Sequence, residues 1–239
     1  MKNRLITENA LNCFTDCSGA AGKSSHGKYD VSCGFNIEFN GKIIESGESI
    51  ILDTDSKYGE RYAICMALDA ALRLVKTSHE SFRRVNIFSD SLGDVEIFKY
   101  MMKKYLVTPE REVQDAIKLD SLARAHKLGN LKLFDRIVRD YETINVTTPV
   151  RFYYVPAHVR YSFPWELGSM IKRFRYNNET RIDAQTARWI CRNNQMIDYE
   201  TSKTLRECMG TLFVRRNEFE GGAVSVERRN GIRVCVKAS

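Results

Sequence analysis

The spacing of apolar residues divides the first part of the chain into strands followed by a helix. Residues 11–16 form a short apolar run, and residues 31–39 and 43–52 flank the pair Asn40-Gly41, which is typical of a tight hairpin turn. We therefore predict an antiparallel meander of three strands. A polar loop follows, and apolar or small residues at helical spacing between positions 63 and 75 then predict a helix.

Helices and strands alternate in the middle of the chain. Residues 81–88 and 150–156 are short apolar runs that predict two more strands. Helical spacing occurs at 92–105, at about 110–125, at 131–141 and at 165–174. This order of elements predicts an α/β fold in which a five-stranded sheet is flanked by helices.

A polar stretch at residues 176–180 predicts a boundary, with one domain at 1–176 and a small basic domain at 177–239. In the second part, residues 181–193 and 199–209 have the pattern of two helices. Residues 211–216, 223–228 and 232–237 have the pattern of short strands separated by glycine-containing turns. We therefore predict a C-terminal α+β unit of two helices and a short antiparallel sheet.

Charge and cysteine content narrow the class of protein. The 239 residues carry a net charge of +7, which favours polyanionic partners such as nucleic acid. No segment has the apolar length of a membrane span or of a secretory signal. The seven cysteines are odd in number and form no CxxC pair, so we expect reduced thiols, no zinc site and a cytoplasmic, intracellular protein.

Three acidic residues stand at the ends of predicted elements. Asp16 ends the first apolar run, Glu60 opens the first predicted helix, and Asp90 follows the fourth predicted strand. Mg²⁺ prefers oxygen ligands, and carboxylates far apart in sequence can converge at strand and helix ends. The sequence therefore predicts a metal site. A turn cap for Asp16, a helix-dipole charge for Glu60 and a helix N-cap for Asp90 are the alternative interpretations.

Short motifs around these acids resemble those of the type 1 ribonuclease H family. They are Thr15-Asp16-Cys17-Ser18, Gly59-Glu60, Ser89-Asp90-Ser91, and Pro156-Ala157-His158 followed by Trp165-Glu166. The resemblance covers about residues 9–175. It implies a ribonuclease H-like mixed sheet and two Mg²⁺ ions, for which Mn²⁺ can substitute. It also implies an endonuclease that hydrolyses the RNA strand of RNA–DNA hybrids.

The same resemblance gives roles to individual side chains. Asp16, Glu60 and Asp90 would hold the metal ions, Glu166 would be the fourth ligand, and His158 would assist proton transfer to the product. The chain departs from the family pattern at Cys17, at Ala157 and in the spacing from His158 to Glu166. Two alternatives therefore stay open: an RNA-binding or other nucleic-acid-binding protein that cleaves poorly or not at all, and a resolvase- or transposase-like nuclease that prefers DNA.

Polar and basic residues near the acids and in the C-terminal part are candidate contacts for nucleic acid. The partner we expect is an RNA–DNA hybrid or a structured RNA. A solvated charged face is the alternative interpretation for the C-terminal arginines. The candidate nucleic-acid-binding residues are Ser18, Lys23, Lys57, Tyr58, Arg188, Arg192, Arg215 and Arg216.

Overall fold

A computed structural model describes residues 8–19, 29–105, 131–215, 223–229 and 232–237. The helix expected at about 110–125 lies outside these residues. Among the described helices, none has the length and apolar character needed to cross a membrane.

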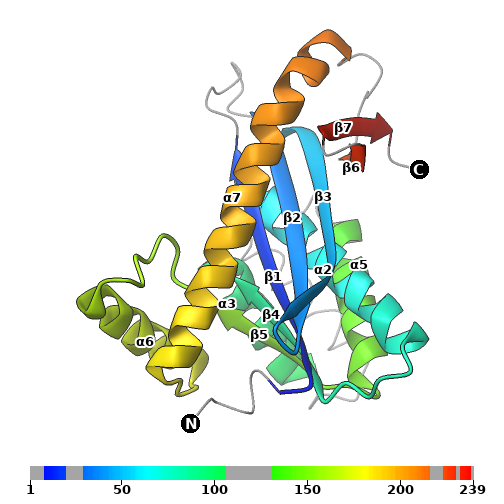
Figure 1. Cartoon of the computed structure of the whole chain (residues 1–239). Coiled ribbons are helices and arrows are strands. Elements are labelled where there is room, and N and C mark those ends of the chain that lie inside the picture. Colours follow the sequence, from blue (N-terminus) through cyan, green and yellow to red (C-terminus); the bar gives the residue numbers. More distant parts are fainter. Residues whose placement is uncertain (1–7, 20–28, 106–130, 216–222, 230–231, 238–239) are drawn as a thin grey trace.

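A mixed, open sheet forms the centre of the molecule (Figure 1). β1 pairs in parallel with β4, and β4 pairs in parallel with β5, while β2 and β3 continue the sheet in antiparallel pairing. The strand order β5-β4-β1-β2-β3 places β1 in the middle of these five. The bounds are β1 (Ala10–Gly19), β2 (Tyr29–Phe39), β3 (Lys42–Thr54), β4 (Arg84–Ser89) and β5 (Val150–Tyr154).

The predicted hairpin turn between β2 and β3 is confirmed. Asn40 and Gly41 both have a positive φ, 50° and 86°, which is the backbone of a type I′ turn. Such a turn matches the right-handed twist of the two strands that it joins. The local sequence therefore determines the register of β2 against β3 close to the turn.

Helices cover both faces of the sheet. The pair α2 and α5 packs with α3 on one face, whereas α6 and α7 lie on the other face, where α7 crosses β1 and β2 (Figure 1). The predicted α/β class is thereby confirmed. The bounds are α2 (Ser56–Thr77), α3 (Leu92–Tyr105), α5 (Leu131–Asn145), α6 (Pro164–Asn178) and α7 (Ala184–Arg215).

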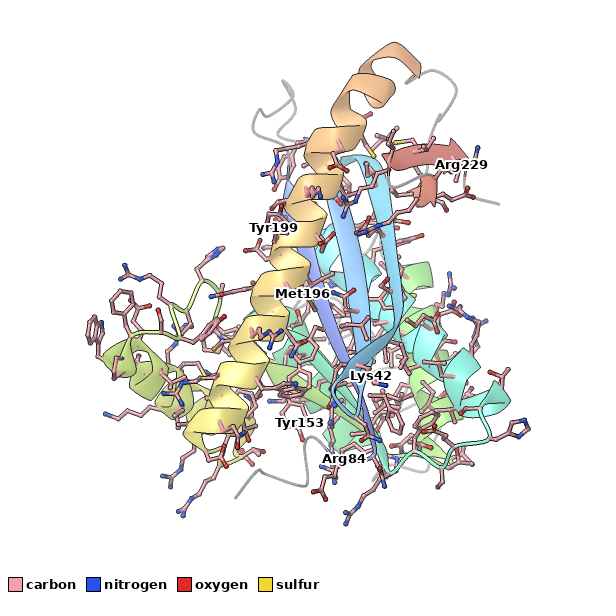
Figure 2. The ribbon with its side chains drawn as sticks, viewed as in Figure 1. Lys42, Arg84, Tyr153, Met196, Tyr199 and Arg229 are labelled. Atoms are coloured by element: carbon pink, nitrogen blue, oxygen red, sulfur yellow. The ribbon has the colours of Figure 1, made fainter. Side chains whose placement is uncertain are left out.

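Successive side chains of β1 point to opposite faces of the sheet, and each face has its own apolar core. Leu11 and Cys13 face the core under α2, α3 and α5, while Phe14 faces the core under α6 and α7. In the second core the Phe14 ring stacks on Phe88 with 4.7 Å between centroids, and Phe88 stacks on Tyr153 of β5, which Figure 2 labels. Both faces of the central strands are therefore buried, as their continuous apolar runs require.

The C-terminal part differs from the expected two helices and three strands. Residues 184–215 form one continuous helix, α7, and the strand expected at 211–216 lies within its end up to residue 215. Between 193 and 199 the chain has no glycine or proline to break the helix. The asparagines there are accommodated on the buried side, where Asn193 Nδ2 donates to the carbonyl oxygen of Trp189 at 2.9 Å.

The last two strands extend the main sheet. β6 (Ala223–Arg229) pairs antiparallel with β3, and β7 (Ile232–Lys237) pairs antiparallel with β6, which makes a seven-stranded sheet. The unit expected at 177–239 thus contacts the sheet directly through α7 and β6. Local patterns predicted the β6–β7 hairpin, but its pairing with β3 is a long-range contact that they do not contain.

Arg233 joins the hairpin to α7 and β3. Its side chain is 2% exposed, and its guanidinium donates to Glu48 on β3 at 2.9 Å and to Glu207 on α7 at 2.9 Å, with a further bond to Glu200. Burial alone would raise the pKa of Glu48, but bonds from Arg233 and Thr204 hold it below its ordinary value. One buried cation therefore holds carboxylates from two other elements.

Candidate metal centre

The end of the β1–β4 pairing brings Asp16 and Asp90 together. The last paired residues are Thr15 and Ser89, and each aspartate is the next residue along its strand. Because the two strands are parallel, the residues after this pair emerge at the same edge of the sheet. Asp16 is 4% exposed and Asp90 is partly buried. Sequence-distant carboxylates thus become neighbours through strand register.

Helix α2 supplies Glu60. Asp55 caps this helix by accepting from the backbone N–H of Tyr58 at 2.9 Å. Gly59 lets the start of α2 approach β1, since a Cβ at this position would lie 2.2 Å from the sulfur of Cys17. The side chain of Glu60 therefore reaches over the end of β1 toward Asp16.

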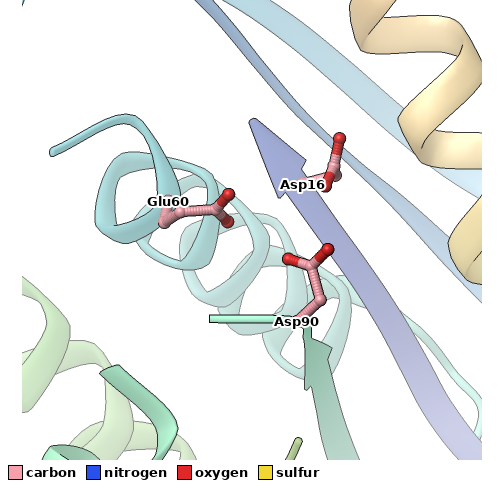
Figure 3. A group of neighbouring side chains, drawn as sticks. All are labelled: Asp16, Glu60 and Asp90. Atoms are coloured by element: carbon pink, nitrogen blue, oxygen red, sulfur yellow. The ribbon is translucent and has the colours of Figure 1, made fainter. Parts of the chain in front are cut away.

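Asp16, Glu60 and Asp90 form one compact group (Figure 3). Each offers a carboxylate oxygen, and these oxygens all lie within 4.8 Å of one another. Burial, followed by repulsion from Asp90, raises the pKa of Asp16 to about 7. Burial and then Asp16 and Asp90 raise the pKa of Glu60 well above its ordinary value. Ionising all three carboxylates together is costly unless a cation is bound.

The donor set fits a hard divalent cation. One carboxylate oxygen of Glu60, Oε2, is buried and has no hydrogen-bond partner within the described residues. The neighbouring Arg61 does not supply that partner: its Nε binds Asp94 at 2.5 Å, and its buried Nη1 also has no partner within the described residues. An oxygen buried without a partner is costly, and a metal ion would satisfy it. The three carboxylates together are the residues that could hold such an ion.

Helix α7 adds two residues that the sequence analysis did not single out. Thr201 Oγ1 donates to Asp16 Oδ2 at 2.9 Å, and so fixes the orientation of that carboxylate. Asp198 lies one helical turn before Thr201, and its charge contributes to the raised pKa of both Asp16 and Asp90. The available signal was a pair of polar residues, Asp198 and Thr201, about one turn apart on a long helix. Splitting α7 at 193–199 obscured it.

The structure does not bring Glu166 into this group. Both of its carboxylate oxygens are bound by Arg160: Oε2 accepts from the backbone N–H at 2.8 Å and Oε1 accepts from Nε at 2.6 Å. His158 does approach the site. Its Nδ1 lies 3.8 Å from Asp198 Oδ2, its side chain is 80% exposed, and its backbone has a φ of 53°.

The candidate contacts for nucleic acid are dispersed. Ser18 lies against α7, with its hydroxyl 2.9 Å from that of Ser202. Tyr58 packs on the core and stacks with Tyr62, whereas Lys57 is exposed. Two arginines are exposed one turn apart on α7, namely Arg188 and Arg192. Lys23, Arg216 and the side chain of Arg215 lie outside the described part of the chain.

Comparison with protein-family models finds no match, and comparison with curated proteins finds none either. Solved structures do match. RNase H1 of the halophilic archaeon Halobacterium salinarum is 16% identical, with 62% of this chain and 86% of that chain covered and a TM-score of 0.38. LC11-RNase H1, isolated from compost by a metagenomic approach, is 16% identical, with 69% and 97% covered and a TM-score of 0.41.

A third match is the foamy viral protease-reverse transcriptase in complex with an RNA/DNA hybrid. It is 13% identical, with 76% of this chain but 20% of that chain covered and a TM-score of 0.46. The mixed sheet of β1 to β5, with helices on both faces, is the architecture that the sequence motifs led us to expect, and β6 and β7 extend it. The chain has a ribonuclease H-like fold.

The raised pKa of Asp16 predicts how stability depends on pH when no metal is present. An acid whose folded-state pKa is about 7, against roughly 4 when unfolded, binds its proton more tightly in the folded state. Its stabilising contribution is complete below the unfolded pKa and is lost as pH rises through the folded pKa. We expect the free energy of unfolding in EDTA to fall by a few kcal/mol between about pH 4 and pH 7.

Urea unfolding at pH 5, 6, 7 and 8 measures this dependence. Added Mg²⁺ should remove most of the fall, because the ionised carboxylates bind it only in the folded state. A metal-free protein whose stability is constant or rises over this range would contradict the prediction.

Proposed function

We propose that the chain is a divalent-metal-dependent endonuclease that hydrolyses the RNA strand of RNA–DNA hybrids. The observation that carries the proposal is the group of Asp16, Glu60 and Asp90, whose oxygens lie within 4.8 Å and whose pKa values are all raised. The motifs around these acids support the choice of an RNA strand, and the net charge of +7 supports a polyanionic partner.

The residues would divide the work as follows. Asp16, Glu60 and Asp90 would hold Mg²⁺ or Mn²⁺, and an ion held there would supply an activated water and stabilise charge on the leaving oxygen. Thr201 keeps the Asp16 carboxylate in place. During hydrolysis a water oxygen bonds to phosphorus and gives up one proton to solvent, the bond from phosphorus to the 3′ oxygen breaks, and that oxygen takes up a proton. His158, exposed beside Asp198, is placed to deliver it.

Asp198 rather than Glu166 is our candidate for the fourth acid. Asp198 acts electrostatically on Asp16 and Asp90, whereas Glu166 is bound by Arg160. We expect Asp198→Asn to lower cleavage by about 10- to 100-fold and to raise the Mg²⁺ concentration needed for half-maximal rate. Glu166→Gln is the matched control and should leave both quantities near the wild-type values. Equal losses in the two variants, or a loss with Glu166→Gln alone, would contradict this assignment.

A substrate panel tests the function as a whole. The pure protein is incubated with a labelled RNA–DNA hybrid, duplex DNA and single-stranded RNA, each with Mg²⁺, with Mn²⁺ or with EDTA, beside an Asp90→Asn control. The proposal predicts metal-dependent cleavage of the RNA strand of the hybrid, with loss of cleavage in the control. Cleavage of duplex DNA in preference to the hybrid would favour the resolvase-like alternative. Salt-sensitive binding without cleavage of any substrate would favour the non-catalytic binding protein.

A further inference from the structure

Exposed aromatic side chains gather on one layer of the molecule. Among the large apolar side chains that are exposed in the described residues, the aromatic ones all lie on α6, at its start or on α7, whereas those on other elements are aliphatic. The aromatic ones are Phe163 (37% exposed), Trp165 (67%), Tyr176 (86%) and Tyr199 (57%). Tyr199, which Figure 2 labels on α7, directly follows Asp198.

Helix α6 arranges three of its exposed side chains in a row. Trp165, Lys172 and Tyr176 are seven and four residues apart, and this spacing places them on one helical face. All three are exposed, while Leu167, Met170 and Phe174 anchor the opposite face in the core with Phe14 and Phe88. We call the row of Trp165, Lys172 and Tyr176 the α6 aromatic face. It spans about 16 Å, roughly the length of five stacked nucleotides.

Side-chain contacts tie the start of α6 to the loop that carries His158. The guanidinium of Arg160 lies 5.0 Å from the centre of the Phe163 ring, and the Phe163 and Trp165 rings are 4.8 Å apart. Arg160 is fixed in turn by its bonds to Glu166. His158, two residues before Arg160, approaches Asp198. An aromatic platform that is already ordered loses little conformational entropy when it binds a flat partner.

Charge indicates the kind of partner. Residues 160–192 contain seven lysines and arginines against three acidic residues, a net charge of +4 out of +7 for the whole chain. Aromatic rings interleaved with cations are the usual means of binding single-stranded nucleic acid, in which bases stack on rings and phosphates meet the cations. A paired duplex offers few open base faces to such rings. The chemistry therefore favours unpaired nucleotides.

We propose that the α6 aromatic face binds a single-stranded stretch of nucleic acid that flanks the duplex held at the metal centre. The inference rests on the proposed function, which it extends from a hybrid to a hybrid with an unpaired extension. Trp165 and Tyr176 stack on bases of the extension, and Lys172 neutralises a phosphate between them.

Binding is measured in EDTA, so that cleavage plays no part in the result. The probes are a blunt RNA–DNA hybrid and the same hybrid with five-nucleotide single-stranded extensions of RNA or DNA at either end. We expect one extension to tighten binding by about tenfold for the wild type. The advantage should be lost in Trp165→Ala/Tyr176→Ala and kept in Trp165→Phe/Tyr176→Phe. Ile232→Ala is the control, because Ile232 has the same 67% exposure as Trp165 but lies on β7.

Tryptophan fluorescence gives an independent measurement. The chain has two tryptophans, and Trp189 packs against Phe14 and Phe88, so a signal lost in Trp165→Phe reports on Trp165. Quenching by extended but not blunt hybrids supports the proposal. No advantage from any extension, or an equal advantage in the double alanine variant, overturns it. Self-association that disappears with Trp165→Ala would also overturn it, because the face would then be a contact between copies. A chain that never cleaves can still pass this test.

Discussion

Asp16→Asn is expected to lower metal-dependent cleavage by about a thousandfold and, in EDTA at pH 8, to make the protein more stable. A bound metal contributes several kcal/mol to the transition state, and each 1.36 kcal/mol is tenfold in rate. The asparagine oxygen can still accept the bond from Thr201. Because the pKa of Asp16 is about 7, its charge at pH 8 is a cost that the neutral amide removes.

Hybrid cleavage rates and urea unfolding curves measure the two effects on the same samples. Asp53→Asn is the matched control, since Asp53 is exposed just before α2 and has a φ of 50°, which asparagine tolerates. The cleavage rate and the free energy of unfolding of the control should both stay near the wild-type values. An Asp16→Asn protein that loses activity together with stability would show instead that the aspartate supports the fold.

Arg233→Met should destabilise the protein by about 3 kcal/mol at pH 7. Removing one partner of a buried ion pair leaves the other charges without compensation, which commonly costs 3–5 kcal/mol. We take the lower end because Glu200 and Glu207 are 26% and 37% exposed. Glu48, 11% exposed, keeps a second partner in Arg228 at 3.3 Å.

Arg229→Met on the same hairpin is the control. Arg229 is 63% exposed and pairs with Glu227, itself 52% exposed, and such surface pairs contribute less than about 1 kcal/mol. Urea unfolding followed by circular dichroism compares the two variants. If both variants lost the same small amount of stability, the buried guanidinium of Arg233 would not be needed to hold the hairpin in place.

The sequence predicted those parts of the site that depend on local structure. Asp16 and Asp90 follow apolar strands, and Glu60 lies in the first turns of a capped helix, so each position could be read from its own neighbourhood. The β2–β3 turn followed from Asn40 and Gly41 for the same reason. Parallel register then places the two aspartates side by side once β1 and β4 are known to be neighbours.

The parts that the sequence did not reveal depend on contacts between distant segments. The bond from Thr201 to Asp16 spans 185 residues, and no local pattern encodes it. The family resemblance favoured Glu166 because it lies on the helix that follows the His158 loop, whereas Thr201, which binds Asp16, lies on the next helix, α7. In the same way, the β6–β7 hairpin was recognised as a hairpin, whereas its pairing with β3 is a tertiary contact.

Gly59 and Cys17 lie in close contact, so the effect of a substitution at one of these positions depends on which residue occupies the other. A methyl group at 59 would lie 2.2 Å from the Cys17 sulfur, so in Gly59→Ala either that sulfur or the start of α2, which carries Glu60, has to move. Shortening residue 17 to glycine removes this closest contact and leaves a Val31 methyl, at 3.1 Å, as the nearest atom. Gly59→Ala should therefore be harmful in this chain and much less harmful beside Cys17→Gly, which is non-additivity of the kind that a double-mutant cycle measures. In related chains, a larger residue at position 59 is thus expected to occur together with a smaller residue at position 17. A substitution that one chain tolerates at position 59 therefore does not predict that another chain will tolerate it.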